Sequence, residues 1–256
     1  DIVSNFDIRI SDLKKMKKCR LDDFLIAHSL VKDRQEAFIV VTEGRVLVDG
    51  QKAVTPAQLV SGQAKVELRG EARYVGRGAY KIEAALAAFR IPIEGKVCAD
   101  IGAATGGFTE VLLKRGAKKV YAIDTARGKL AFKLRRDPRV ALMEETDVRG
   151  LASLPELADC GVIDVSLISL RQILPEVKRL LKPDGVVAAL FKPQYETRAP
   201  RMLQHGVIRN AADREMLLKD FTDWAQAHGW EIRDRIESPI RGSKGNVEYL
   251  FHFTLR

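Results

Sequence analysis

Aspartates at the ends of short apolar runs, with one glycine-rich turn, are the residues of this sequence best suited to hold a polar small molecule. Residues 97–108 read V-C-A-D-I-G-A-A-T-G-G-F, where an apolar run ends in Asp100 and a glycine-rich turn leads into a helix expected over residues 108–115. An apolar run, a glycine turn and a helix form the opening of a nucleotide-type βα unit. Glycines let the backbone approach a ligand closely, and the helix N-terminus offers N–H groups that lack intrahelical partners.

The spacing of this turn indicates which ligand it would hold, although a generic glycine-rich turn is the alternative. It is D-x-G-x-x-x-G rather than G-x-G-x-x-G. This favours S-adenosylmethionine over a dinucleotide, because S-adenosylmethionine has no pyrophosphate and needs a carboxylate near its charged amino acid moiety. We expect Asp100 to supply that carboxylate. The other cofactor contacts expected in the turn are Gly102, Ala104, Thr105, Gly106, Gly107 and Phe108.

Two further acids follow the next expected strands. Residues 119–124 read K-V-Y-A-I-D and end in Asp124, about twenty residues beyond the first glycines, where an acid that bonds the ribose hydroxyls belongs. A third strand, Val140–Met143, is followed by Asp147, which we expect to meet the adenine amino group. Three acids at three successive strand ends predict a nucleoside-type cofactor.

A second set of charged residues lies later in the chain. Asp164 interrupts the apolar run 161–165, and Lys192 directly follows the most apolar run, 185–191. A carboxylate at the carboxyl end of a parallel strand lies where open α/β sheets place chemistry. A lysine directly after a central buried strand is an uncommon choice for solubility alone. By contrast, Lys81 on a helix expected over residues 79–89 is by itself an ordinary helix lysine.

The composition limits the classes of function. With 256 residues, 46% of them hydrophobic, the chain can hold one sizeable core and a small second unit. Its apolar runs fall far short of the roughly 18 residues of a membrane span, and no secretory signal shows at the start. Three cysteines without C-x-x-C and four histidines without H-x-x-x-H indicate reduced thiols, a cytoplasmic location and no metal site. The net charge of +9 favours a polyanionic partner.

The hydrophobic pattern divides the chain into four parts. Residues 1–18 lack a clear period and are interpreted as a leader that is not native to the protein. Residues 19–70 predict a small α+β domain with two short helices, over 21–30 and 33–41, and short strands. Residues 71–78 are a polar linker. Residues 79–256 predict an α/β domain that includes a covering helix over 170–181, a mobile loop over 198–210 and a terminal antiparallel pair of strands.

The small domain resembles the αL RNA-binding module named after a small-subunit ribosomal protein. The match rests on R-L-D-D-F-L at residues 20–25 and E-G-R-V-L-V-D-G at residues 43–50. In that module basic residues contact the RNA backbone, which fixes position more than sequence; a solvated basic face is the alternative. The resemblance, with one arginine of the linker, implies the RNA contacts Lys17, Lys18, Arg20, Arg34, Arg45 and Arg77.

From residue 19 onward the chain resembles the TlyA (hemolysin A) family, a branch of the FtsJ-like RNA ribose methyltransferases. The most specific pieces are R-G-A-Y-K, D-I-G-A-A-T-G-G-F-T-E-V-L-L, D-V-S-L-I-S-L, F-K-P-Q-Y-E and G-N-V-E-Y. The resemblance implies a doubly wound Rossmann-like α/β sheet of order 3-2-1-4-5-7-6 with the last strand antiparallel. It implies methyl transfer to a ribose 2′-oxygen, with cytidines of ribosomal RNA as substrate. It also implies a catalytic tetrad of Lys81, Asp164, Lys192 and Glu248.

The chemistry of such a transfer is compatible with these four residue types. A ribose hydroxyl is a poor nucleophile, so it needs a base, or a cation that stabilises the developing alkoxide, together with in-line placement. A lysine acts as a base only when burial or a neighbouring cation depresses its pKa. We expect Lys192 to act on the hydroxyl, Asp164 to orient it, and Lys81 and Glu248 to set charge and hydrogen bonding. A structural ion-pair network is the alternative for all four.

Three other functions compete with this interpretation. A cytolytic protein, as the hemolysin name suggests, would need membrane insertion, and the sequence has neither a span nor a strongly amphipathic membrane helix. A catalytically silent RNA-binding protein would show a damaged tetrad or glycine turn, and both are intact. A DNA amino-methyltransferase would carry D/N-P-P-Y/F/W, whereas this chain has K-P-Q-Y. The sequence therefore predicts an S-adenosylmethionine-dependent methyltransferase whose partner is ribosomal RNA or a ribosomal subunit.

Overall fold

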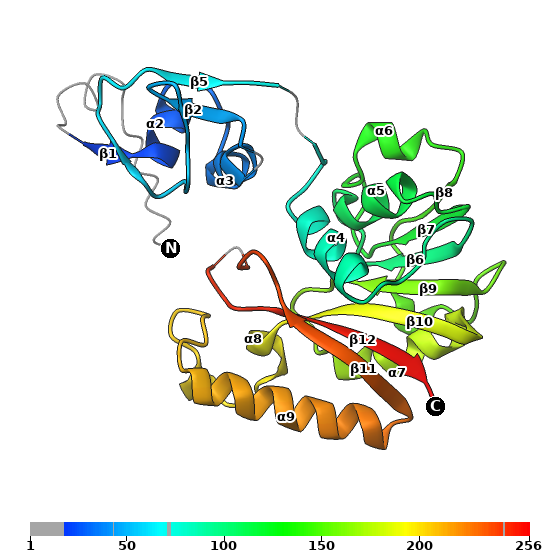
Figure 1. Ribbon diagram of the computed structural model, residues 1–256. Coiled ribbons are helices and arrows are strands. Elements are labelled where there is room, and N and C mark those ends of the chain that lie inside the picture. Colours follow the sequence, from blue (N-terminus) through cyan, green and yellow to red (C-terminus); the bar gives the residue numbers. More distant parts are fainter. Residues whose placement is uncertain (1–17, 43, 71–72, 243) are drawn as a thin grey trace. The chain divides into compact units, whose positions relative to one another are not determined.

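A seven-stranded sheet forms the centre of residues 74–256 (Figure 1). Its strands lie in the spatial order β8-β7-β6-β9-β10-β12-β11, and within this sheet β12 runs antiparallel to the other six strands. Numbered from the first strand of this sheet, that order is 3-2-1-4-5-7-6, so the fold expected from the sequence is confirmed. The strands are β6 (Val97–Ile101), β7 (Lys119–Ile123), β8 (Val140–Met143), β9 (Ala158–Ile163), β10 (Leu181–Phe191), β11 (Trp230–Glu237) and β12 (Tyr249–Leu255).

The structure is a computed structural model that describes residues 18–42, 44–70, 73–242 and 244–256. The chain divides into two compact units, and the boundary in the sequence falls between Arg73 and Tyr74. Lys17 and all but the last residue of the expected leader lie outside the described residues. Among the described helices, none combines the length and apolar character that a membrane crossing requires.

Helices cover both faces of the large sheet because successive side chains of each buried strand point to opposite sides. Cys98 and Val120 belong to a core shared with α4 and α5, whereas Ala99 and Tyr121 belong to a core on the other face, with α7 and α9. The helices of this unit are α4 (Gly78–Ala88), α5 (Gly107–Lys114), α6 (Phe132–Arg135), α7 (Leu174–Val177), α8 (Pro193–Glu196) and α9 (Ala211–Ala227). Short 3-10 turns are η1 (Val148–Gly150), η2 (Leu170–Gln172), η3 (Lys178–Leu180) and η4 (Pro200–Met202).

The single covering helix expected over residues 170–181 is wrong. The segment is broken into η2, α7 and η3, and Pro175, which has no N–H to donate, lies in the first turn of α7. The strand that follows begins at Leu181 rather than at residue 185. Leu181 pairs with Ala158 and Val186 with Cys160, so an irregularity in β10 absorbs the residues between, which include a proline and a glycine.

The smaller unit has the α+β character expected for residues 19–70. Its helices α2 (Leu21–Ala27) and α3 (Arg34–Thr42) pack their apolar residues, among them Leu25 and Val40, into one small core. The strands form a three-stranded sheet of order β3-β2-β5 and a separate pair, β1-β4. Their bounds are β1 (Cys19–Arg20), β2 (Val46–Val48), β3 (Gln51–Lys52), β4 (Leu59–Val60) and β5 (Val66–Leu68).

Most of the polar segment expected as a linker over residues 71–78 packs on the larger unit. Tyr74 is 4% exposed and belongs to the core formed with α4 and α5. The backbone N–H of Val75 donates to Oε2 of the buried Glu110 at 2.7 Å. Residues 71 and 72 lie outside the described part of the chain. The backbone that enters α4 is therefore fixed to the larger unit.

Candidate active site

The carboxyl ends of the parallel strands converge beside the point where the strand order reverses, between β6 and β9. Asp124 follows β7 directly, Asp164 follows β9 directly, and Lys192 follows β10 directly. The N–H of Asp164 donates to the carbonyl of Ile101 at 3.0 Å, which ties the end of β9 to the end of β6. This is the place where open α/β sheets bind their ligands.

Two glycines of the turn after β6 are required by close packing. Gly102 has φ +87°, and a Cβ there would lie 2.4 Å from the carbonyl oxygen of Asp164. Gly106, at the N-cap of α5, has φ +94°, and a Cβ would lie 2.3 Å from a methyl of Leu134. Side chains are excluded at both positions, because both the backbone conformation and the space demand glycine.

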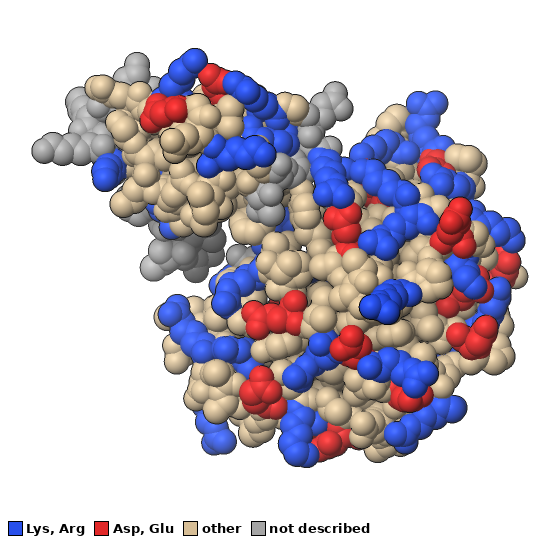
Figure 2. All heavy atoms as spheres, in the orientation of Figure 1, with Lys and Arg blue, Asp and Glu red and all other residues tan. Residues whose placement is uncertain are grey.

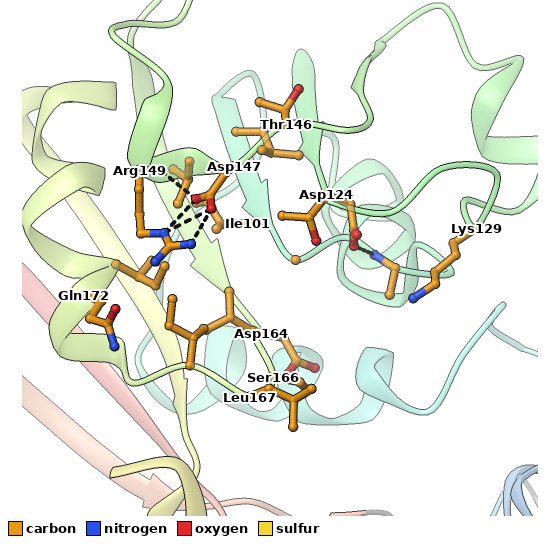
Figure 3. A pocket seen from close by; sticks show the side chains of 18 residues that line it. Ile101, Asp124, Lys129, Thr146, Asp147, Arg149, Asp164, Ser166, Leu167 and Gln172 are labelled. Atoms are coloured by element: carbon orange, nitrogen blue, oxygen red, sulfur yellow. Dashed lines mark hydrogen bonds and ion pairs between the residues drawn. The ribbon is translucent and has the colours of Figure 1, made fainter.

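A pocket of about 610 Å³ opens at these strand ends (Figure 3). Four of the expected cofactor residues line it, namely Gly102, Ala104, Asp124 and Asp147, and Asp164 lines it as well. The volume is that of a site for a nucleoside-sized ligand. The other expected cofactor residues are not on its wall: Asp100, Thr105, Gly106, Gly107 and Phe108.

Asp100 is fully buried within β6. Its Oδ2 accepts a hydrogen bond from the Thr109 hydroxyl at 2.6 Å, while its Oδ1 is buried without a hydrogen-bond partner among the described residues. Burial removes the carboxylate from water and is the main reason that the pKa of Asp100 is raised to about 7, with a further contribution from the negative charge of Asp164. A cationic ligand group near Oδ1 would favour the ionised form.

The other two acids of the pocket already hold partners from their own loops. Asp124 accepts backbone N–H groups from Ala104 and Ala126, each at 2.7 Å. Asp147 forms an ion pair with Arg149 at 2.5 Å, marked in Figure 3, and this hydrogen bond is the main cause of the lowered pKa of Asp147. Each carboxylate still faces the pocket and retains lone pairs for a ligand hydroxyl or amino group.

Lys192 and Asp164 form one lysine–carboxylate pair. Lys192 Nζ lies 2.6 Å from Asp164 Oδ1 and 2.9 Å from the hydroxyl of Ser166. Lys192 is 8% exposed, whereas Asp164 and Ser166 line the pocket. An ammonium has three donors, and two are used here among the described residues. The third has no acceptor among the described residues, and Lys192 is next to the pocket through Asp164 and Ser166 without lining it.

Lys81 and Glu248 form a second pair, with Lys81 Nζ 2.5 Å from Glu248 Oε2 and both residues buried. The backbone of Gly242 packs directly on this carboxylate, since a Cβ at Gly242 would lie 2.4 Å from Glu248 Oε1. The N-terminus of α4, which carries Lys81, adjoins the first pair, because a Cβ at Gly78 would lie 3.7 Å from Asp164 Oδ2. The structure thus brings the four tetrad candidates together as two adjacent pairs.

Arg77, expected to contact RNA, lies beside the second pair. Its guanidinium donates to the carbonyl of Arg241 at 2.7 Å. Burial lowers the pKa of Arg77, and the negative charge of Glu248 opposes that effect. The residue is therefore part of the packing around Glu248.

Ser166 and Glu196 are site residues that the sequence analysis did not single out. Ser166 belongs to the motif D-V-S-L, in which a hydroxyl two residues beyond a strand-end acid is the available signal. Glu196 is buried and accepts hydrogen bonds from the hydroxyl of Ser169 at 2.5 Å and the N–H of Leu170 at 2.7 Å. It thereby joins α8, just after Lys192, to the loop that follows Asp164.

The basic residues expected to bind RNA in the small unit are at its surface. Lys18 is exposed, and Arg20 and Arg34 form ion pairs with Asp22 and Asp23 at 2.6 and 2.7 Å. Arg45 donates to the carbonyls of residues 69 and 70. No group of three histidine, cysteine or acidic residues that could hold a metal ion is found among the described residues.

The fold and the pocket together define a methyltransferase. The sequence profile of the FtsJ-like methyltransferases matches residues 74–255, and the chain belongs to this family. A relative from Mycobacterium tuberculosis, the 16S/23S rRNA (cytidine-2′-O)-methyltransferase TlyA, is 39% identical over 91% of this chain and 88% of its own length. Hemolysin A of Brachyspira hyodysenteriae is 36% identical over 92% of this chain and 100% of its own length. A solved structure from Streptococcus thermophilus that carries a hemolysin name has a TM-score of 0.72 and 37% identity, covering 94% of this chain and 89% of that one.

Proposed function

We propose that the protein transfers a methyl group from S-adenosylmethionine to a ribose 2′-hydroxyl of ribosomal RNA, with cytidine as the modified nucleoside. The observation that carries this proposal is the Lys192 ammonium, which is held by two residues that line the pocket, Asp164 and Ser166, and has a third donor that no described residue takes. The name of the Mycobacterium tuberculosis relative, a 16S/23S rRNA (cytidine-2′-O)-methyltransferase, supports the RNA substrate and the position of the methyl group.

The residues of the pocket fit S-adenosylmethionine. Asp124 and Asp147 supply carboxylate oxygens for ribose hydroxyls and an adenine amino group, and Gly102 leaves backbone exposed on the wall. The unpartnered Oδ1 of Asp100 fits the proximity of a cationic amino group, although Asp100 itself is behind the wall. When bound, the cofactor supplies a methyl group on a positively charged sulfur. We assign the remaining turn residues, 105–108, to the shape of the turn rather than to direct contact.

The Lys192–Asp164 pair acts on the hydroxyl. Lys192 donates its third hydrogen bond to the 2′-oxygen, and its positive charge stabilises the negative charge that develops there. Asp164 orients the hydroxyl and accepts its proton through the oxygen that Lys192 does not hold. Ser166 fixes the direction of the lysine. Because these groups are already in position, the reaction avoids the reorganisation of solvent that the same step would require in water.

The second pair holds the first in place. Lys81 and Glu248 are buried opposite charges, and α4 carries Lys81 while its first residue adjoins Asp164. Removing either partner would leave a buried charge uncompensated. The small unit, with Lys18, Arg20, Arg34 and Arg45 on its surface, docks the RNA in this proposal. A ribosomal RNA substrate implies that the reaction takes place in the cytoplasm.

The test is transfer of labelled methyl groups from S-adenosylmethionine to purified small and large ribosomal subunits from cells that lack the enzyme. Digestion to nucleosides should place the label in 2′-O-methylcytidine, and Lys192→Met should remove it. Label in a base, or no label in either subunit despite measured cofactor binding, would contradict the proposal. The same preparation should lyse erythrocytes no faster than buffer, which tests the hemolysin name that a relative carries.

A further inference from the structure

Two loops of the larger unit carry positive charge without any acidic residue. Residues 197–212 contain Arg198, Arg201 and Arg209, and residues 238–247 contain Arg241 and Lys244, with no aspartate or glutamate in either stretch. All five side chains are exposed, and within the described part of the chain none forms an ion pair. We call these five residues the basic-loop surface.

The two loops are joined to each other through Asn246, which is 3% exposed. Its Oδ1 accepts from the N–H of Ile208 at 3.0 Å, and its Nδ2 donates to the carbonyl of Gly206 at 2.9 Å. A bridge between Gln204 and Val207 closes the first loop on itself. One buried amide thus joins two segments that are about forty residues apart in the sequence, and these segments are the loops that carry the five cations.

The basic-loop surface lies next to the catalytic pairs. The first loop begins directly after α8, which itself starts at the residue after Lys192. The second loop packs on Glu248 through Gly242, whose N–H donates to the carbonyl of Asn246 at 2.9 Å. In Figure 1 the two loops lie beside α8, and in Figure 2 lysine and arginine side chains gather over them.

Two pairs of residues on α9 and β11 show the opposite arrangement, in which each cation has an acidic partner. Lys219 pairs with Asp223 on α9, and Arg233 pairs with Glu231 on β11, each at 2.6 Å. Neighbouring cations without acids repel one another and destabilise the folded chain unless an anion binds them. Arginine offers a planar fork of donors that matches a phosphate group, so an exposed arginine-rich surface fits a phosphate chain.

We propose that the basic-loop surface binds the phosphate backbone of the RNA on either side of the nucleotide that enters the pocket. The choice of RNA as the polyanion rests on the proposed function; the existence of an anion-binding surface rests on the charges and on Asn246. Phosphate contacts of this kind position a strand without reading its sequence. The surface would therefore hold the target strand in place while the Lys192–Asp164 pair acts on one ribose.

The test compares two charge-matched double variants of the full chain. Arg209→Ala/Lys244→Ala removes one cation from each loop, and Lys219→Ala/Arg233→Ala removes two paired cations from α9 and β11. Binding of a fluorescein-labelled 30-nucleotide RNA is measured across a salt series without S-adenosylmethionine. The basic-loop variant should bind about tenfold more weakly at 0.1 M salt, and its logarithmic salt slope should fall by about 1.4, because each lost single-strand phosphate contact removes about 0.7. The control variant should match the wild type within about twofold.

The outcomes separate this inference from the proposed function. Unchanged RNA affinity and salt slope in the basic-loop variant would overturn the proposal that this surface binds RNA, even if the wild type methylates ribosomal RNA. If the basic-loop variant binds RNA more weakly and with a smaller salt slope, but the wild type methylates no RNA, the RNA-binding surface would be supported and the proposed function contradicted. Vesicles containing 30% phosphatidylserine serve as a second probe: loss of vesicle binding with unchanged RNA binding would overturn the assignment to RNA in favour of a membrane.

Discussion

The two lysine–carboxylate pairs of the larger unit have the same chemical composition and different surroundings. Lys192 and Asp164 follow two adjacent parallel strands, and Asp164 lines the pocket. Lys81 and Glu248 come from a helix and from the residue before an antiparallel strand, and neither lines the pocket. In the proposed function the first pair acts on the substrate, and the second supports the elements that carry the first. We base this assignment of roles on position at the strand ends rather than on residue type.

Asp100 is a third carboxylate of the larger unit, and unlike Asp164 and Glu248 it is buried without a lysine partner among the described residues. It lies on the strand next to the one that Asp164 follows, and among the described residues the Thr109 hydroxyl is its one side-chain hydrogen-bond donor. Burial raises the pKa of Asp100 to about 7.

The largest expected effect comes from Asp164→Asn. The amide keeps the volume but removes the proton acceptor and the charge that holds Lys192, so kcat should fall by about a thousandfold. The matched change Ser166→Ala removes only a neutral hydrogen bond and should cost about tenfold. Methyl transfer under saturating S-adenosylmethionine and RNA measures both. Equal losses in the two variants would mean that Asp164 has no role beyond fixing the lysine.

Lys81→Met should affect stability and activity together. It leaves Glu248 buried without its partner, which costs about 3–5 kcal/mol of unfolding free energy, and we expect kcat to fall by about tenfold or more. The double variant Lys81→Met/Glu248→Gln removes both charges and should recover most of the stability but not the activity. Urea unfolding and kcat are measured on the same preparations. If the double variant recovers both stability and kcat, the Lys81–Glu248 pair has a purely structural role.

Asp100→Asn should change how stability depends on pH. The ordinary pKa of 3.8 is raised to about 7 in the folded protein, so between these values the folded state binds one more proton than the unfolded state. This contribution to stability is complete below pH 4 and is lost as the pH rises through 7. Between pH 5 and pH 8 the unfolding free energy of the wild type should fall by about 2–3 kcal/mol. The Asp100→Asn variant should not show this fall. Urea unfolding at the two pH values checks this, and parallel curves would refute it. S-adenosylmethionine affinity of the variant should fall as well.

Much of the larger unit could be predicted because its strands are buried on both faces and read as apolar runs. The same runs placed Asp124, Asp164 and Lys192 at their carboxyl ends, and the structure has them there. The helix expected over residues 170–181 failed because apolar spacing was given more weight than Pro175.

Other features depend on tertiary contacts that a linear pattern does not contain. The burial of Tyr74 could not be predicted because this residue lies in a polar stretch of the sequence. It depends on the packing of α4 against α5. Asn246 joins segments that are distant in sequence, and Gly242 is required only because Glu248 packs against it.

In the proposed function Lys192 acts on the ribose hydroxyl and does not bind S-adenosylmethionine, although its partner Asp164 lines the same pocket as the expected cofactor contacts. The most direct test is Lys192→Met, assayed by single-turnover methyl transfer to ribosomal subunits and by equilibrium binding of S-adenosylmethionine. We predict a rate lower by at least about a thousandfold, with cofactor affinity within about threefold of the wild type. A variant that transfers methyl groups within about tenfold of the wild-type rate, or that loses cofactor affinity in parallel with its rate, would contradict the account.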